Sequence, residues 1–221
     1  KEKIMKRILL VIMLAFSTIL CKAQPKSVTG VTKNTQTKYT QEYLQKYFDD
    51  LNIKGSITIY DYKNKKWFYS DEKDAYKRTL PASTFKIPNS LIFIEEYAVK
   101  DENEVLKWDG TIREIPSHNA DTDLKTAYKN STVWFHQEMS RKVGTNKYKT
   151  YLKMFSYGNQ NLSGKSDYFW LDNTLTISPV EQINFLQGVY EEKYPLSKRT
   201  YNIMKNVMIE KQTDSYTLRA K

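Results

Sequence analysis

The sequence is poor in the residues that build disulfide networks and metal centres. Its 221 residues include one cysteine, Cys21, and two histidines, His118 and His136. A single cysteine excludes an intramolecular disulfide, so packing must hold the fold together. The histidines stand 18 positions apart with no cysteine or carboxylate pattern around them. We therefore expect no metal site, because metal centres need clustered ligands.

The chain also lacks a hydrophobic run long enough to span a bilayer. Its longest run, residues 8–20, has 13 residues, whereas a spanning helix needs about 20. A basic segment precedes this run and Ala23 follows it, which is typical of a secretory signal peptide. We predict that residues 1–23 are a signal peptide cleaved after Ala23, and that the periplasmic product has no stable membrane insertion. The alternative, a lipid anchor on Cys21, is disfavoured because bulky Leu20 stands where a lipoprotein signal has a small residue.

Charge and composition narrow the class of partner. The formal net charge is +10, and removing the five basic residues and one acidic residue of residues 1–23 leaves +6. Such an excess could serve nucleic acid or an anionic surface. The lysines are scattered, however, and no nucleic-acid motif accompanies them, so we interpret them as solvated surface and expect no nucleic-acid partner. Hydrophobic and aromatic contents of 40% and 14% predict a packed globular domain.

Hydrophobic periodicity outlines one domain over residues 24–221. It predicts a helix over residues 43–51, a hairpin from residues 56–61 and 66–70, and mostly helical structure from 88 to 165. Ser178, Pro179 and Glu181 form a capping box with proline at the first helical position, and Ser197 caps another helix. Residues 215–221 alternate like a strand. We expect an α+β fold with a mainly antiparallel sheet, flanked by helices and carrying an inserted all-helical lobe.

Ser83 and Lys86 stand three residues apart in "PASTFKIPNSLIFIEEY". This spacing puts both side chains on one face of a helical or 3₁₀ turn, with the regular helix expected to begin at Pro88. Serine becomes a nucleophile when a neighbouring base removes its proton. A lysine can be that base when burial disfavours its ammonium form, and Phe85 and Ile87 provide an apolar setting.

The Ser-x-x-Lys spacing alone has little specificity. A second copy, Ser70 to Lys73 in "SDEK", indicates an exposed polar turn without chemistry. What distinguishes Ser83 is its apolar context and the motifs that follow it. These are, in order, "STV" at residues 131–133, "YGN" at 157–159, "FWL" around Trp170, and the final Lys221.

In this order and at these separations, the motifs resemble those of the class D β-lactamases (oxacillinases), among the serine penicillin-recognising enzymes. The resemblance implies that Ser83 is the acylated nucleophile and that Lys86 carries a CO₂-derived carbamate, with no other cofactor. It further implies a catalytic and substrate-binding role for Ser131, and a catalytic role for Trp170 through an indole N–H that supports the carbamate. Lys221 matches the substrate-binding lysine that opens the family's Lys-Thr/Ser-Gly motif.

The same resemblance implies a set of residues that shape the site: Phe85, Val133, Tyr157, Asn159 and Leu171. Phe85 and Val133 would exclude water from the lysine. Structural alternatives stay open for several motif residues. Ser131 could be the N-cap of the helix "STVWFHQEM", Tyr157 and Asn159 could serve ordinary turn chemistry, and Trp170 could be a core residue.

In the family register, further elements would follow Lys221. They are the Thr/Ser-Gly pair, the strand residue whose N–H completes the oxyanion hole, a carboxylate-binding arginine, and the closing strands and helix. The sequence ends at Lys221, so we expect a domain truncated at its C-terminus, either as a fragment or as a truncated gene product. We expect residues 24–221 alone to be neither stable nor active, because an unpaired strand edge and uncovered apolar surface remain and one oxyanion donor is missing.

The implied function is a serine β-lactamase that hydrolyses the β-lactam amide through an acyl-enzyme on Ser83, with carboxylated Lys86 as general base. Such an enzyme binds penicillin and confers antibiotic resistance, and its partner is a small β-lactam substrate. Which β-lactams are hydrolysed, carbapenems included, depends on loops that the pattern does not specify. The alternatives are a penicillin-sensing receptor domain, a D,D-peptidase and, for the chain as given, an inactive truncated binding protein.

Overall fold

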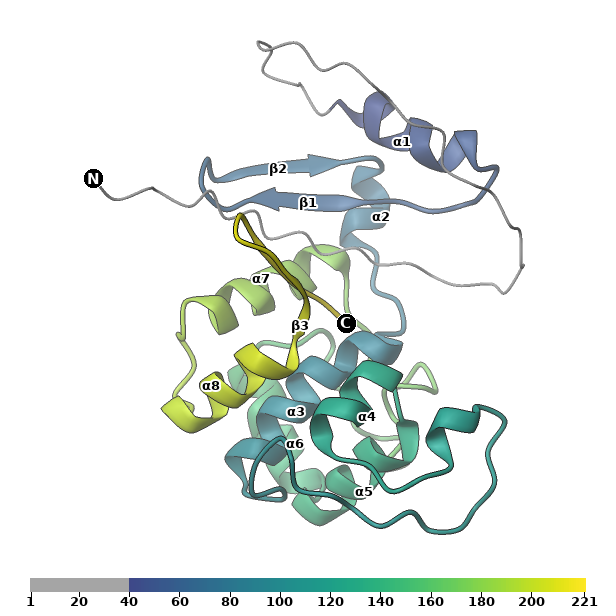
Figure 1. Cartoon of the computed structure of the whole chain (residues 1–221). Helices are drawn as coiled ribbons and strands as arrows, with labels where there is room; N and C mark the ends of the chain where they lie inside the picture. Colours follow the sequence, from purple (N-terminus) through teal and green to yellow (C-terminus); the bar gives the residue numbers. More distant parts are fainter. Residues whose placement is uncertain (1–39) are drawn as a thin grey trace.

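The computed structural model describes residues 40–221, and the predicted signal peptide with Cys21 lies outside the described residues. A hairpin with a helix on its outer side stands over a helical body (Figure 1). The elements are α1 (Gln41–Asp50), β1 (Thr58–Asp61), β2 (Lys66–Tyr69), α2 (Glu72–Tyr76), η1 (Ala82–Phe85), α3 (Lys86–Glu95), η2 (Pro116–His118), α4 (Leu124–Asn130), α5 (Val133–Val143), α6 (Thr145–Met154), α7 (Pro179–Tyr190), α8 (Lys198–Val207), β3 (Ile209–Gln212) and β4 (Thr217–Arg219).

The N-terminal helix and hairpin confirm the periodicity of this region. The Thr40 hydroxyl caps α1 by accepting a hydrogen bond from the Tyr43 N–H at 3.1 Å. The helix ends at Asp50, with Leu51 as its C-cap. Strands β1 and β2 pair antiparallel, with Thr58 opposite Tyr69. Helix α1 packs on β2, while α7 packs against α2 and β1.

Ser70 is not the exposed residue that the sequence predicted. Its side chain is 2% exposed, and its hydroxyl accepts a hydrogen bond from the Ile57 N–H at 2.9 Å. The Ser70 N–H in turn donates to the Ile57 carbonyl at 3.0 Å. The expectation was wrong because the hairpin pairing continues one residue beyond the strands. Lys73, by contrast, is exposed on α2, so the second Ser-x-x-Lys pair is a structural serine and a surface lysine.

Helix α3 is the centre of the molecule, and every residue from Lys86 to Ile94 is buried. It begins at Lys86 rather than at the expected Pro88, directly after the 3₁₀ turn η1. Pro88 is tolerated because the first-turn N–H groups of a helix have no intrahelical partner. Helices α5 and α8 pack along it. The core therefore forms around α3, and whatever α3 carries is removed from water.

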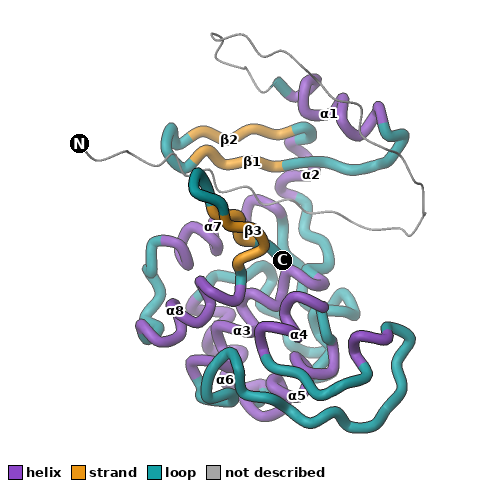
Figure 2. The backbone as a smooth tube through the Cα atoms, viewed as in Figure 1, coloured by secondary structure: helices purple, strands orange, loops and turns teal. Residues whose placement is uncertain are grey.

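The helical lobe predicted between residues 88 and 165 is present as α4, α5 and α6, beside the long loop that precedes α4 (Figure 2). An isolated bridge between Leu106 and Thr122 closes that loop. Helix α4 is capped by the Asp123 carboxylate, which accepts a hydrogen bond from the Thr126 N–H at 2.7 Å. The lobe covers one side of α3 and brings the start of α5 beside it.

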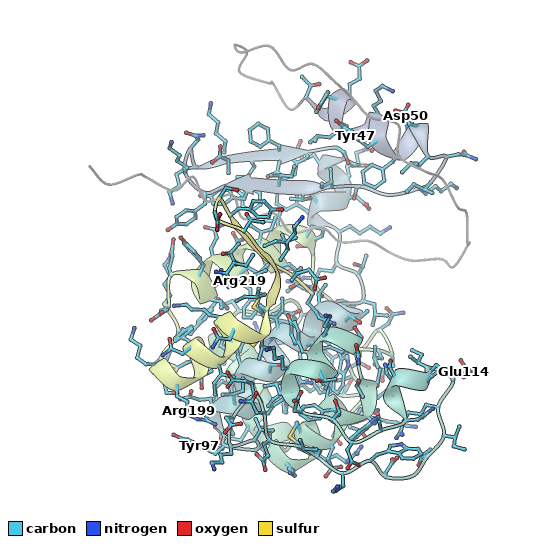
Figure 3. The ribbon with its side chains drawn as sticks, viewed as in Figure 1. Tyr47, Asp50, Tyr97, Glu114, Arg199 and Arg219 are labelled. Atoms are coloured by element: carbon cyan, nitrogen blue, oxygen red, sulfur yellow. The ribbon has the colours of Figure 1, made fainter. Side chains whose placement is uncertain are left out.

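Helix α8 covers another side of α3, and its N-terminus is fixed by side chains of α3 and the turn after it. Glu95 accepts hydrogen bonds from the backbone N–H and the hydroxyl of Ser197. The Arg199 guanidinium donates to the Ile94 carbonyl at 2.7 Å and lies 4.4 Å from the Tyr97 ring (Figure 3). These contacts fix α8 at the far end of α3, away from Lys86.

The fold class is confirmed as α+β with antiparallel strand pairs. Within residues 40–221 the strands pair only inside two separate hairpins, β1–β2 and β3–β4, rather than in one sheet. No strand of the described chain pairs with both hairpins and joins them into one sheet.

No helix in this part of the chain is long and apolar enough to cross a bilayer.

The predicted capping box at α7 is present. Ser178 Oγ accepts from the Glu181 N–H at 3.3 Å, and the Glu181 carboxylate accepts from the Ser178 N–H at 2.9 Å. Ser178→Ala should therefore cost about 1 kcal/mol of stability, a fall in melting temperature of roughly 2–4 °C for a domain of this size. The control is Ser163→Ala at an exposed loop position. Equal melting of both variants would contradict the cap.

Candidate active site

The turn η1 delivers Ser83 and Lys86 to the same place. Lys86 Nζ donates a hydrogen bond to Ser83 Oγ at 3.2 Å, as the i, i+3 spacing predicted. Ala82, just before the serine, has a φ of +47°, a left-handed conformation that costs alanine roughly 1–2 kcal/mol. Its N–H donates to the Trp170 carbonyl at 3.2 Å. The serine thus sits on a strained turn that is held in place by the chain around Trp170.

Burial decides the charge of Lys86. The residue is 2% exposed, and desolvation, followed by the positive charge of Lys221, lowers its pKa to about 7. A lysine in this state is a free amine in a large fraction of molecules at neutral pH. A free amine has a lone pair, so in its neutral form Lys86 can accept from the Ser83 hydroxyl across the same 3.2 Å contact and take its proton.

An aromatic cluster forms the wall of the site on the Phe85 side. The Phe85 ring stacks on Trp170, with centroids 5.2 Å apart and planes at 19°. Phe169 and Tyr157 pack edge-on against the same ring, at 5.2 and 5.8 Å. Trp170 is 1% exposed, so it is a core residue and also adjoins the turn that carries the serine. Leu171 follows it, partly buried against the core.

Ser131 joins α4 to α5 and is not the N-cap of α5. It is the C-cap of α4, with a left-handed φ of +57°, while Thr132 is the N-cap of α5. The N-cap interpretation was wrong because helix α4 continues through Asn130 and reverses at Ser131. Strained non-glycine positions of this kind cluster at functional sites. Val133, the first residue of α5, is half-buried beside it.

The end of the chain returns to this junction. The Tyr128 carbonyl accepts hydrogen bonds from the Ser131 N–H and from Lys221 Nζ, and the Tyr128 hydroxyl donates to the Ala220 carbonyl at 3.1 Å. Burial lowers the pKa of Lys221 to about 8. One carbonyl therefore brings Ser131 and Lys221 together, and Figure 1 shows the C-terminus above α4 and the start of α3.

Tyr157 is linked by hydrogen bonds to η1, the turn that carries Ser83. It is fully buried, and its hydroxyl donates to Gln182 Oε1 at 3.2 Å. Gln182 Nε2 donates in turn to Thr84 Oγ1 at 2.5 Å. This chain connects Tyr157 to the residue beside Ser83, with Gln182 supplied by α7. Tyr157 therefore contacts η1 through the Thr84 side chain and through the Phe85 ring.

Asn159 ties the loop after α6 to residues 174–177. Its side-chain oxygen accepts from the Thr176 N–H at 3.1 Å, and its amide group donates to the Thr174 carbonyl at 2.9 Å. Gly158 has a φ of +55°, and a Cβ there would lie 2.0 Å from the Thr176 carbonyl oxygen. The structure therefore explains two residues of the Tyr-Gly-Asn motif: Gly158 leaves room for the Thr176 carbonyl, and Asn159 hydrogen-bonds the neighbouring backbone.

Sequence reasoning missed a polar group behind Lys86. Asn89, one turn further along α3, accepts a hydrogen bond from the Tyr148 hydroxyl and donates to the His136 carbonyl at 3.5 Å. His136 is fully buried. Asn89 was detectable as a polar residue at i+3 from Lys86 inside an apolar run. His136 was not, because no local pattern indicates which face of α5 meets α3.

Among residues 40–221, no group of three or more histidine, cysteine or acidic side chains is placed to hold a metal ion. The sequence-predicted polar residues that the structure brings together are two lysines and two serines: Ser83, Lys86, Ser131 and Lys221.

Comparisons with known proteins agree with this geometry. Residues 51–221 match the penicillin binding protein transpeptidase domain. The chain is 38% identical to beta-lactamase OXA-48 of Klebsiella pneumoniae over 208 residues, which are 94% of this chain and 77% of that protein. The chain belongs to the class D β-lactamase family.

Two further class D relatives show how much is shared. The crystal structure of a class D beta-lactamase from Sebaldella termitidis matches with a TM-score of 0.78 and 56% identity, covering 80% of this chain and 71% of that one. A probable beta-lactamase, YbxI of Bacillus subtilis, is 41% identical over 167 residues, or 76% of this chain. The matched region spans 62% of the length of the Bacillus protein.

The pKa of Lys86 makes a prediction about stability. This pKa lies near 7 in the folded protein, whereas that of an unperturbed lysine is 10.5. Between these values the unfolded chain binds the proton that the folded chain releases, so stability rises with pH from about 7 to 10.5. At about 1.36 kcal/mol per unit, the burial of Lys86 costs on the order of 4 kcal/mol at pH 7.

Lys86→Met should therefore melt several degrees above the wild type at pH 7 in CO₂-depleted buffer, and the difference should shrink as the pH approaches 10. Thermal unfolding across this range measures it. Lys73→Met, at an exposed position, is the control and should change little. A Lys86→Met protein no more stable than the wild type at pH 7 would contradict the burial argument.

Proposed function

We propose that this chain is the catalytic unit of a serine β-lactamase. The observation that carries the proposal is the 3.2 Å hydrogen bond between Ser83 Oγ and the amine of buried Lys86. Ser83 attacks the carbonyl carbon of the β-lactam ring while its proton passes to the base at Lys86. The ring C–N bond then breaks, which leaves an ester on Ser83 and a proton on the former ring nitrogen. Water hydrolyses that ester in a second step.

Lys221 and Ser131 supply the polar side of the pocket. β-Lactam antibiotics carry a carboxylate, and Lys221 is the cation fixed beside Ser131 through the Tyr128 carbonyl. A cation held there attracts the substrate carboxylate, and the Ser131 hydroxyl can pass a proton to the departing ring nitrogen. The electrostatic attraction is stronger than in water because Lys221 is partly buried.

We further infer that Lys86 works as a carbamate. The residues fit this modification, because CO₂ adds only to a free amine and the buried Lys86 has a pKa near 7. The rings of Phe85 and Trp170 keep water from the adduct. When present, the carbamate supplies an oxygen base suited to both steps. The Trp170 indole N–H is the donor we assign to one of its oxygens.

The matched domain also includes penicillin-binding proteins, which makes a D,D-peptidase or a penicillin sensor the alternative. All three would be acylated at Ser83. They differ in the rate at which water removes the acyl group, and a buried lysine that can take up CO₂ favours fast removal.

Export fits the same proposal, with residues 1–23 as the signal that directs the protein to the periplasm.

Covalent labelling tests the nucleophile. In the native protein, Ser83→Ala should abolish labelling by a fluorescent penicillin, because Ser83 is the serine whose hydroxyl is hydrogen-bonded to the amine of buried Lys86. Ser70→Ala is a demanding control. It should lower the melting temperature by leaving the Ile57 N–H unpaired and still label fully. Equal labelling of wild type and Ser83→Ala would refute the assignment.

Bicarbonate tests the carbamate. Protonation of the amine removes the adduct, so hydrolysis of a chromogenic cephalosporin should fall below about pH 7 and recover on addition of bicarbonate. Trp170→Ala should raise the bicarbonate needed for activity, and Lys86→Ala should acylate slowly without turnover. Full activity in CO₂-depleted buffer, unchanged by bicarbonate, would show that Lys86 acts as a plain amine.

A further inference from the structure

Three buried polar side chains on α3 and at the start of α5 have no hydrogen-bond partner within the described residues. They are Ser90 on α3, and Thr132 and His136 at the start of α5, and all are at most 1% exposed. For His136 both ring nitrogens are unpartnered. An unsatisfied buried polar atom costs roughly 1–3 kcal/mol, so a group of them between two packed helices needs a physical explanation.

Helical spacing places these groups on facing surfaces. Lys86 and Ser90 are one turn apart on α3, as are Thr132 and His136 at the start of α5, and residues at i and i+4 share a face. Helices α3 and α5 pack against each other. Phe93, a further turn along the same stripe of α3, lies 5.8 Å from the His136 ring. The His136 imidazole therefore faces the stripe of α3 that begins at Lys86.

His136 is also held in a fixed position and is coupled to the site electrostatically. The Asn89 side chain donates to its backbone carbonyl at 3.5 Å, and Phe135 packs 5.7 Å from its ring. Burial, followed by the charges of Lys86 and Lys221, lowers the pKa of His136 well below its usual range. Tyr148 is also connected to this segment, because its hydroxyl donates to the Asn89 side chain that bonds to the His136 carbonyl.

We propose that His136 accepts, through water held by Ser90 and Thr132, the proton that Lys86 releases when its amine combines with CO₂. The inference rests on the carbamate proposed above. In this step the Nζ lone pair forms a bond to the carbon of CO₂ and one Nζ–H bond breaks. The proton moves to the free lone pair of the imidazole, so that one carbamate anion and one imidazolium cation are formed.

Electrostatics favours this direction of transfer. While Lys86 can carry a positive charge, it opposes a proton on His136. Once Lys86 is a carbamate its charge is negative, and the same interaction attracts a proton to the imidazole. A buried anion needs a partner of opposite charge, and an imidazolium beside it would provide one. The histidine would thus act by keeping the lysine carboxylated, as a positioning residue that touches no substrate.

The chain has two histidines, which makes the test direct. The protein is equilibrated with ¹³C-bicarbonate, and the carbamate is measured by its ¹³C NMR signal without any substrate. His136→Asn keeps hydrogen-bonding capacity but cannot take a proton, and His136→Phe removes both. Each should raise the bicarbonate needed for half-carboxylation roughly tenfold or more, the expected loss for one charge-assisted hydrogen bond.

The control is His118→Gln. His118 is also buried, but its Nε2 lies 3.0 Å from the Asn130 carbonyl oxygen, so this variant should change stability without changing the bicarbonate midpoint. Unchanged midpoints in both His136 variants would overturn the proposal while leaving the carbamate intact. Absence of any carbamate signal in the wild type would instead overturn the carbamate itself, and the inference with it.

A further measurement uses the wild-type protein, so its result does not depend on whether a variant folds. The ¹⁵N chemical shifts of the His136 ring should change from those of neutral imidazole to those of imidazolium as bicarbonate is added at constant pH, while those of His118 stay the same. An imidazole that remains neutral when the carbamate forms would overturn the proposal whatever the variants show.

Discussion

The burial of one amine, that of Lys86, is the constraint on which the rest of the site depends. A lysine in water at neutral pH is protonated and cannot act as a base. Here the whole of α3 from Lys86 to Ile94 is enclosed by other elements, and desolvation brings the lysine pKa to about 7. Packing around α3 is therefore part of the chemistry, because any loosening that admits water restores the charge.

The groups around this amine show how its position is maintained. Two hydrogen bonds hold η1, the turn that carries Ser83. The Ala82 N–H donates to the Trp170 carbonyl, and the Gln182 side chain donates to the Thr84 hydroxyl. Each is a side-chain or backbone contact between segments far apart in sequence. These contacts join α7 and the Trp170 segment to one short turn and fix its position.

Strained backbone and an unpartnered buried side chain are both present at the site. Ala82 and Ser131 both adopt left-handed backbone conformations, and His136 is buried without a partner for its ring within the described chain. A domain's stability is commonly only about 5–15 kcal/mol, so features of this kind persist when the surrounding structure enforces them. The buried lysine adds a further cost of the same order, which the apolar packing of the core must offset.

Much of this protein could be predicted from local sequence alone. Caps at Ser178 and Ser197, the β1–β2 hairpin and the Ser83–Lys86 turn each depend on residues within a few positions of one another, because hydrogen bonds and side-chain faces in helices and turns repeat over short spacings. The motif register then predicted site roles for Ser131, Trp170 and Lys221, which lie far along the chain.

The tertiary structure alone decided what those residues meet. Ser131 became a C-cap rather than an N-cap because α4 runs through Asn130, and Ser70 became buried because the hairpin closes over it. The contact of the His136 ring with Phe93 of α3 depends on the packing of α5 against α3. Burial and electrostatic coupling are sums over neighbours supplied by distant segments, so no local pattern encodes them.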